Sequence, residues 1–243
     1  MIEVRDLAIG YDGKAVQRDL NFEVPAGQLV AILGGSGCGK TTLLRTLVGL
    51  LPAISGSLVV GGLRDPANHR GQAPFGVMFQ MGALFSSMTL EQNVSLPLEV
   101  WTDLDEDTIS EIARAKLALV GLDGQGALVP AEISGGMNKR AAIARAMALD
   151  PPLLFLDEPS AGLDPSTSAG LDELILSLRD GLGTTIVLVT HELESILSLN
   201  ARCLMLDPVE GTLIADGLPE DLRDHSDHST VRAFFRREMT SQP

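Results

Sequence analysis

A glycine-rich stretch near the N-terminus has the residue types and spacing that bind phosphate. The segment GGSGCGKTT spans 34–42 and fits the pattern G-x-x-x-x-G-K-[ST]. Glycines let successive backbone N–H groups turn toward one anion, and the start of a following helix adds partial positive charge. The lysine of such a loop reaches the β- and γ-phosphates of a nucleoside triphosphate, and the next hydroxyl binds Mg²⁺. The predicted nucleotide-binding residues are Gly34, Gly35, Ser36, Gly37, Cys38, Gly39, Lys40, Thr41 and Thr42, with Thr41 also a metal ligand.

Two adjacent carboxylates at the end of an apolar run could complete this chemistry. The segment LLFLDEPSAGLDP (153–165) places Asp157 and Glu158 directly after four apolar residues. An acidic residue at such a strand end holds Mg²⁺ beside a phosphate loop, which predicts Asp157 as a metal ligand. Glu158 projects differently and is suited to orient or deprotonate an attacking water. The chain has no Asn-Lys-x-Asp segment for reading guanine, which disfavours a GTPase.

The elements that must position these residues are those of an α/β protein. Short continuous apolar runs indicate strands that are buried on both faces of a parallel sheet. Such runs occur at 29–33, 75–79, 153–156 and 185–190. A leucine-rich helix is expected at 41–51, directly after the phosphate loop. The opening segment, from Ile2 to about Val30, carries short β-like stretches with turn signals and predicts an N-terminal β layer.

The middle of the chain has a different character. Helical periodicity replaces strand-like runs there, notably at 108–122 and 136–149. We therefore expect a helical subdomain, about 82–150, inserted into a single domain that covers 1–243. The segment VRAFFRREM (231–239) lies in a C-terminal tail of about 225–243 and predicts an amphipathic helix. Its Phe234–Phe235 pair could pack on its own domain or dock on a partner subunit.

Composition narrows the possible partners. The formal net charge is −14, and such a surface repels nucleic acids, because each phosphate contact needs a Lys or Arg. It equally disfavours lying directly on anionic lipid. No apolar run approaches the ~20 residues of a membrane helix, and the charged start MIEVRDLAIG is not typical of a signal peptide. The two cysteines give no sign of an oxidising compartment. We expect no nucleic-acid partner and no direct membrane insertion.

A second glycine motif carries a resemblance to a known family. The segment ISGGMNKR (133–140) is similar to the Leu-Ser-Gly-Gly-Gln signature of ABC-transporter ATPases, and the likeness covers nearly the whole chain. It implies a P-loop NTPase (RecA-like) fold with a parallel-sheet core, an N-terminal antiparallel β layer and an inserted helical subdomain. It also implies that Ser134, Gly135 and Gly136 bind the γ-phosphate held by the phosphate loop of a second copy, in a head-to-tail dimer with ATP between the subunits.

The same resemblance assigns roles to four further residues. Gln80, in VMFQMGALF, resembles the glutamine that senses Mg²⁺ and links hydrolysis to the membrane partner. His191, in VLVTHE, resembles the switch histidine that contacts the γ-phosphate. Asp164, in SAGLDP, resembles an aspartate at the dimer interface, and Tyr11 resembles the aromatic residue that stacks on adenine. The implied cofactors are ATP and Mg²⁺. The implied catalytic residues are Glu158, His191, Lys40 and Gln80, and the implied metal ligands are Thr41, Gln80 and Asp157.

Departures from the commonest signature point to one group within the family. Met137 stands where glutamine is usual, and this form is typical of the Mla-type ATPases that drive phospholipid movement between bacterial membranes. Segments 78–98 and 189–196 and the ending STVRAFFRRE also resemble that group. The resemblance implies an MlaE-like transmembrane permease with an MCE-domain protein as partners. It implies a peripheral location, through the permease, on the cytoplasmic face of the inner membrane.

Other functions share the nucleotide motifs and stay open at this point. One alternative is the ATPase subunit of a small-solute importer, for example for polar amino acids. A second is a non-transport ABC protein acting on ribosomes or in DNA repair, although this chain lacks the second ATPase unit or long coiled coil usual there. A third is a regulatory module without turnover, which Glu158 and His191 disfavour. A smaller hypothesis is that a thiol reagent at Cys38 blocks ATP binding and that Mg-ATP protects this thiol.

Overall fold

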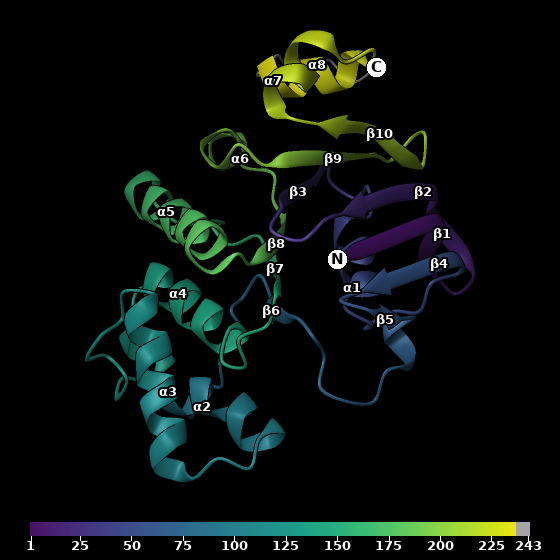
Figure 1. The fold of residues 1–243 in the computed structure, drawn as a ribbon. Coiled ribbons are helices and arrows are strands. Elements are labelled where there is room, and N and C mark those ends of the chain that lie inside the picture. Colours follow the sequence, from purple (N-terminus) through teal and green to yellow (C-terminus); the bar gives the residue numbers. More distant parts are fainter. Residues whose placement is uncertain (237–243) are drawn as a thin grey trace.

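The computed structural model, which describes residues 1–236, has a six-stranded sheet at its centre (Figure 1). The strand order is β10-β9-β3-β8-β7-β6, and every neighbouring pair is parallel except β10 with β9. The strands are β3 (Leu29–Gly34), β6 (Gly76–Met78), β7 (Leu153–Asp157), β8 (Thr185–Val189), β9 (Arg202–Asp207) and β10 (Thr212–Gly217). The four apolar runs form β3, β6, β7 and β8, so the predicted parallel core is confirmed.

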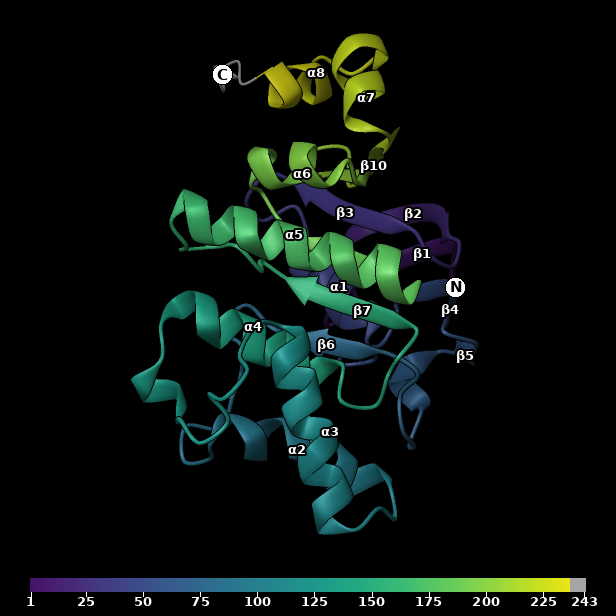
Figure 2. The same cartoon turned by 60° about the vertical axis from the view of Figure 1, so that its left-hand side comes forward.

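Both faces of this sheet are covered, which is why its strands read as continuous apolar runs. Every residue of β3, β7 and β8 is buried. In β3, Leu29 and Ala31 join one apolar cluster, whereas Val30 and Ile32 join another on the opposite face. The first cluster is covered by α5 (Pro165–Leu182) and α6 (Leu193–Leu199), and Figure 2 shows α5 lying across this face of the sheet.

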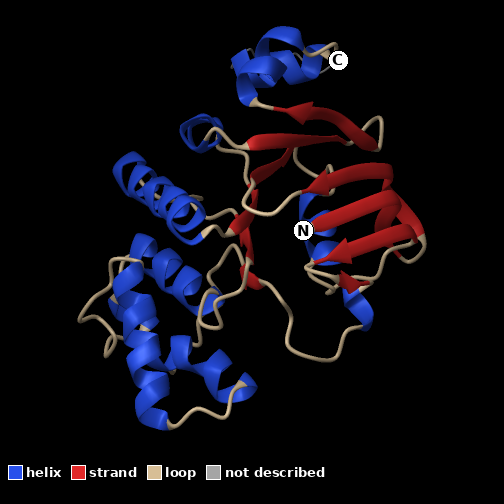
Figure 3. Ribbon diagram, in the orientation of Figure 1, coloured by secondary structure: helices blue, strands red, loops and turns tan. Residues whose placement is uncertain are grey.

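An antiparallel sheet covers the other face (Figure 3). Its order is β2-β1-β4-β5, with β1 (Ile2–Tyr11), β2 (Lys14–Val24), β4 (Ser55–Val60) and β5 (Leu63–Arg64). Helix α1 (Lys40–Leu47) packs between the two sheets, because its leucines share one apolar cluster with inward residues of both. A short 3₁₀ turn (Pro66–Asn68) follows β5. The predicted N-terminal β layer is confirmed, but half of its strands come from the chain after α1.

Three helices form a separate group beside β6 and β7. They are α2 (Leu90–Trp101), α3 (Glu106–Leu119) and α4 (Gly135–Ala146), with a 3₁₀ turn (Pro130–Glu132) before α4. All three lie within the proposed helical subdomain of 82–150, and their apolar faces belong to the same cluster as α5 and α6. Helix α3 ends before the predicted residue 122, because Gly121 adopts a left-handed backbone with φ of 77°.

The chain then crosses the β9–β10 edge of the parallel sheet. Helices α7 (Pro219–His225) and α8 (Ser229–Arg236) lie there, at the end of the molecule opposite α2 and α3 (Figure 1). Val231 and Phe235 of α8 are buried in the same cluster as Leu222 of α7. The rest of the predicted helix, 237–239, lies outside the described residues. Within 1–236 there is no helix with the length and apolar character that crossing a membrane requires.

Candidate nucleotide-binding site

The parallel sheet brings the predicted site residues to one edge of the molecule. The carboxyl ends of parallel strands share an edge, where ligands of open α/β sheets bind. Four strands end almost level, since Ile32 of β3 and Asp157 of β7 both pair with Val189 of β8, and Leu156 of β7 pairs with Met78 of β6. The segments that leave this edge carry Lys40, Glu158, His191 and Gln80.

The phosphate loop leaves β3 and enters α1 through a tight turn. Gly34 has φ of 144°, and a Cβ there would lie 2.4 Å from Cys38 Sγ, so only glycine fits. Lys40 Nζ donates to the carbonyl oxygens of Gly34 at 2.8 Å and Gly35 at 3.1 Å. The lysine therefore lies along the loop, whose residues Gly35, Ser36 and Gly37 are exposed beside the start of α1, the part of a helix that favours an anion.

The three predicted metal ligands line one pocket. Thr41, Gln80 and Asp157 all border a cavity of ≈ 480 Å³. Burial and the neighbouring Glu158 raise the pKa of Asp157, although nearby cationic side chains oppose the shift. The Asp157 carboxylate makes no hydrogen bond within residues 1–236, so its oxygens are available. Hydroxyl, amide and carboxylate oxygens are the ligands that Mg²⁺ prefers, and a cation there would favour the ionised carboxylate. The donor set therefore fits Mg²⁺.

Glu158 is held in an uncommon conformation at the centre of the edge. The residue is buried, and its φ is 48°, a left-handed backbone that costs a non-glycine residue about 1–3 kcal/mol. Its backbone N–H donates to the Val189 carbonyl at 2.8 Å. One carboxylate oxygen, Oε1, lies 2.8 Å from Nδ1 of the exposed His191, whereas the buried Oε2 has no hydrogen-bond partner in the described chain. An oriented carboxylate with a free oxygen is suited to accept a proton from water.

A lysine that sequence reasoning missed connects two of these segments. Lys139, on α4, is buried, and its Nζ donates to the backbone carbonyls of Gln80 and of Glu158, the latter at 2.9 Å. Burial lowers the pKa of Lys139, and the charges of Asp157, Glu158 and Glu192 oppose that shift. The burial of Lys139 could have been predicted from the sequence, because Lys139 shares a helical face with Gly136 and Ile143, which are buried.

A buried amide, also missed, supports the phosphate loop. Gln17 of β2 is fully buried, and its Nε2 donates to the carbonyl oxygens of Cys38 at 2.7 Å and Asp207 at 2.8 Å. Its Oε1 has no partner among the described residues. Gln17 thus ties the loop to the turn between β9 and β10. No motif marks this residue, and the alternation of Leu20, Phe22 and Val24 would place position 18 inside; an irregularity in the β1–β2 register turns Gln17 inward instead.

The signature segment lies away from the phosphate loop of its own chain. Ser134 caps α4, and its Oγ accepts from the Met137 N–H at 3.2 Å. Ser134 and Gly135 are exposed, and a Cβ at the buried Gly136 would meet Thr167 at 2.4 Å. Helix α1 lies on the face covered by the antiparallel sheet, whereas α4 belongs to the cluster on the opposite face. The fold therefore does not bring Ser134–Gly136 together with the other site residues.

Two further predicted residues have structural contacts of their own. The Tyr11 hydroxyl accepts from Thr42 Oγ1 at 3.4 Å, which places this half-exposed ring beside the first turn of α1. Asp164 caps α5 by accepting from the backbone N–H groups of Ser166 and Thr167, each at 3.1 Å. Its exposed carboxylate is thus already engaged within its own chain.

This arrangement defines the class of the protein. A glycine loop between a buried strand and a helix, with a strand-end Asp-Glu pair beside it, is the architecture of a P-loop nucleoside triphosphatase. Comparison with known proteins identifies the family within this class. A family model described as "ABC transporter" matches residues 17–161, so the chain belongs to the ABC transporter family. The predicted family of ABC ATPases is confirmed.

Curated relatives match almost the whole chain. MlaF of Escherichia coli K12, the "Intermembrane phospholipid transport system ATP-binding protein", is 36% identical over 240 residues, which cover 97% of this chain and 88% of MlaF. MlaF of Haemophilus influenzae is 37% identical over 237 residues, covering 96% and 89%. The "Probable ribonucleotide transport ATP-binding protein mkl" of Mycobacterium tuberculosis is 39% identical over 239 residues. This match covers 96% of the chain but 66% of mkl, less than two thirds of that protein.

Solved structures agree with the fold. The "Dimeric structure of a post-hydrolysis state of the ATP-binding cassette MJ0796 bound to ADP and Pi" superposes with a TM-score of 0.78 at 25% identity, covering 90% of this chain and 98% of that one. A second dimeric structure of the same cassette also gives a TM-score of 0.78, at 26% identity. The predicted P-loop fold class is therefore confirmed.

Proposed function

We propose that this chain binds Mg-ATP at the described edge and hydrolyses it as the motor subunit of a lipid transporter. The observation that carries this proposal is the state of Glu158. Its buried carboxylate bonds His191 through one oxygen and leaves the other without a partner, on the same sheet edge as the phosphate loop. A general base needs such a free oxygen together with a fixed orientation.

Different side chains of the chain bind the nucleotide, the metal and the attacking water. Lys40 exchanges its bonds to the loop carbonyls for oxygens of the β- and γ-phosphates, while Tyr11 stacks on the adenine. Thr41, Gln80 and Asp157 would hold Mg²⁺, whose charge would then offset the negative charge of the phosphates.

The remaining two groups act on the water and on the transferred phosphate. Glu158 orients a water in line with the γ-phosphate and accepts its proton on the carboxylate, which turns toward the water when nucleotide binds. His191 holds Oε1 in place, and its exposed ring is free to contact the γ-phosphate. Hydrolysis is supported mainly by positioning and by charge stabilisation, as is general for phosphoryl transfer.

A second copy of the chain completes the site in this proposal. The exposed N-terminus of α4, at Ser134–Gly136, supplies a hydroxyl and backbone N–H groups that suit an anion. The dimeric cassettes with the same fold support a pair. In a head-to-tail arrangement, each ATP lies between the phosphate loop of one copy and Ser134–Gly136 of the other. Loss of the γ-phosphate then lets the pair open.

The transport role is argued from the relatives. A permease of MlaE type with an MCE-domain protein is the proposed membrane partner, and the chain sits on the cytoplasmic face of the inner membrane through it. The names of the relatives differ in cargo, phospholipid for MlaF and ribonucleotide for mkl. We favour phospholipid because the chain spans 88% of MlaF but only 66% of mkl. These names do not favour import of polar amino acids.

Replacing Glu158 tests the ATPase mechanism. Glu158→Gln keeps the size of the side chain but removes the base, so phosphate release should fall by about 10²–10⁴-fold. Affinity for Mg-ATP, measured with a fluorescent ATP analogue, should stay near the wild-type value. Glu111→Gln, an exposed carboxylate on α3, is the matched control and should keep wild-type turnover. Near wild-type hydrolysis by Glu158→Gln would remove the proposed base.

Purification of the tagged chain with its membrane partners tests the cargo. The complex is extracted from membranes of the native host in mild detergent, and proteins and lipids are identified by mass spectrometry. A multi-span permease with an MCE-domain protein and bound phospholipid would support the lipid role. A permease with a soluble solute-binding protein would contradict it and leave the ATPase mechanism intact.

A further inference from the structure

The geometry points to Lys139 as a positioning residue for hydrolysis, which holds the backbone of Glu158 and the segment after β6 in their catalytic arrangement. This inference rests on the proposed function, because it assigns to Lys139 a role that acts through Glu158. Within residues 1–236 Lys139 makes no hydrogen bond to the phosphate loop, and its bond to the pocket-lining Gln80 goes to the backbone carbonyl. Its effect on turnover must therefore pass through the residues whose carbonyls it binds.

Lys139 is buried without a carboxylate partner among the described residues. Its side chain is almost completely buried, with 8% of the residue exposed, although a buried ammonium needs strong compensation. No carboxylate among residues 1–236 forms an ion pair with it. Its hydrogen bonds go instead to the backbone carbonyls of Gln80 and Glu158. A cation that bonds two backbone carbonyls fixes the path of the chain and leaves the side chains of both residues free for chemistry.

The backbone of Glu158 has a conformation that its neighbours must hold. Its left-handed backbone, with φ of 48°, is unfavourable for a glutamate and persists only where neighbours fix it. On one side, its N–H donates to the Val189 carbonyl. On the other side, its carbonyl accepts from Lys139 at 2.9 Å and from the Ala161 N–H at 3.4 Å. Lys139 is the only charged donor in this set, so it is the strongest of these restraints.

Lys139 and Glu158 belong to different structural units. Lys139 lies on α4 of the helical group, Glu158 follows β7 of the parallel sheet, and Gln80 lies on the connection from β6 toward α2. One ammonium thus joins the helical group, the sheet and the connection between them. Movement of α4 relative to the sheet would release the backbone of Glu158 and misplace its free oxygen.

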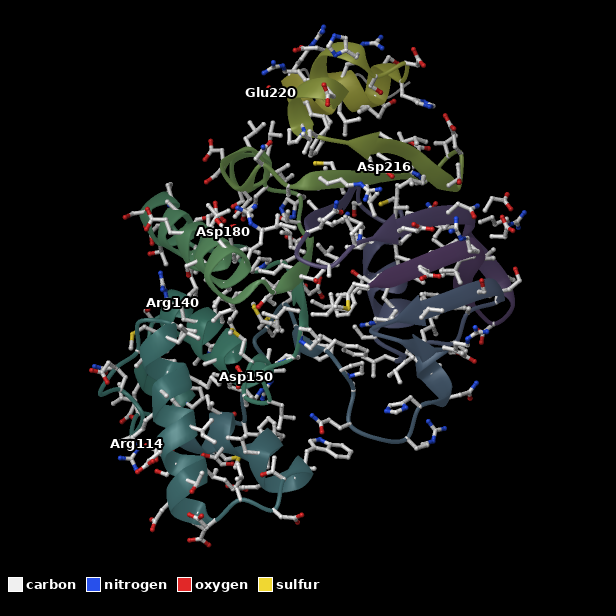
Figure 4. All side chains as sticks on the ribbon, viewed as in Figure 1. Arg114, Arg140, Asp150, Asp180, Asp216 and Glu220 are labelled. Carbon is white, nitrogen blue, oxygen red and sulfur yellow. The ribbon has the colours of Figure 1, made fainter. Side chains whose placement is uncertain are left out.

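The chain offers a matched control on the same helix. Arg140, labelled in Figure 4, also donates to two backbone carbonyls, those of Val120 at 3.0 Å and Gly170 at 2.6 Å. Neither carbonyl belongs to the nucleotide site. Arg140→Met therefore removes a cation and the same number of backbone contacts from α4 as Lys139→Met does, without touching Glu158.

The test measures ATP hydrolysis by the full chain, with kcat expressed per nucleotide-binding site so that unfolded molecules do not count. For Lys139→Met we expect kcat to fall on the order of 10-fold or more, the scale of a lost charge-assisted hydrogen bond, and KM to change by less than about 3-fold. Arg140→Met should keep kcat near the wild-type value even where it lowers the melting temperature. Equal losses of kcat in the two variants would overturn the inference.

A double-variant cycle separates positioning from plain stability. When Lys139 acts through the Glu158 carboxylate, Lys139→Met should cause no further loss of kcat in the Glu158→Gln chain, within about 2-fold. Multiplicative losses would show a role independent of Glu158 and overturn the inference. Failure of the proposed function is distinguishable, because it appears as absent Mg-ATP hydrolysis in the wild-type chain or as full activity of Glu158→Gln.

Discussion

At the scale of single residues, Cys38 shows that membership of a motif does not determine exposure. Cys38 stands inside the phosphate loop, yet its side chain is fully buried beneath Gly34. Burial raises the pKa of the Cys38 thiol, and the nearby Lys40 only partly opposes this. Because the thiolate is the reactive form, both accessibility and ionisation disfavour attack by a thiol reagent. The structure therefore gives the hypothesis of a reagent that blocks ATP binding no support.

Thiol titration provides the corresponding prediction. At pH 8 the native chain should react with a chromogenic disulfide reagent far more slowly than free cysteine does, with or without Mg-ATP. A raised pKa moves the thiolate to higher pH, so the rate should still be rising above the pH range in which an ordinary thiol is fully ionised. Cys203, whose pKa burial raises to about 12, should behave likewise. In denaturant both thiols should react quickly, and rapid native labelling suppressed by Mg-ATP would contradict the buried placement.

The candidate site could be predicted from sequence where chemistry and spacing are local. The phosphate loop and the Asp157–Glu158 pair were found because each motif is fixed by what it must do to a phosphate, whereas His191 was assigned through the family resemblance. Gln17 and Lys139 were not found, because their partners are backbone carbonyls that are distant in the sequence. Such contacts depend on tertiary structure, and no local pattern of side chains predicts them.

At the scale of elements, the parallel strands at the centre of the sheet were predictable from the sequence, but strands β9 and β10 at its side were not. Strands β3, β6, β7 and β8 are short apolar runs because both faces of the sheet are covered. The β9–β10 hairpin was not named from the sequence, although the four central residues of β9 are buried. Pairing β9 beside β3 joins segments more than 160 residues apart, between Val30 and Arg202, and only the folded sheet reveals it. Helix α4 carries both Ser134, which caps its start, and Lys139, about one turn further along.

Helix α8 allows a prediction that separates core packing from partner docking. Phe235 is buried in the domain core with 4% exposed, while its neighbour Phe234 is half-buried and meets it edge to face at 5.2 Å. Phe235→Ala should lower the free energy of unfolding by about 3–5 kcal/mol, the usual cost of truncating a buried phenylalanine to alanine. Phe234→Ala, the matched variant, should cost clearly less. Chemical denaturation of both variants measures the difference.

The result of these two substitutions decides whether the C-terminal tail packs on its own domain or docks on a partner subunit. A large loss at Phe235 alone would mean that α8 is part of its own domain, as its packing with α7 and β10 indicates. Truncation after Ser229 should then also destabilise the chain. Equal and small losses at both phenylalanines would contradict this and return attention to docking on a partner subunit.

At the scale of the whole molecule, the nucleotide site of one chain is half of the proposed catalytic unit. Each copy carries a formal charge of −14, so two copies repel each other and bound ATP adds further negative charge. Association must therefore come from specific contacts with the phosphates rather than from general attraction. Moderate salt, which screens charges beyond about 8 Å, should weaken the repulsion more than the close contacts to the γ-phosphate.

Mixing two inactive variants tests the composite site. Lys40→Met disables the phosphate loop, and Ser134→Asp places a negative charge against the γ-phosphate while keeping a good helix cap on α4. Pairs of either variant alone have two defective sites. A mixed pair has one site with both defects and one intact site, so an equal mixture should recover about a quarter of wild-type phosphate release if copies pair at random. Because the intact site exists only across the interface, no recovery at any mixing ratio would contradict a head-to-tail pair. Full activity of Ser134→Asp alone would instead favour hydrolysis within a single chain.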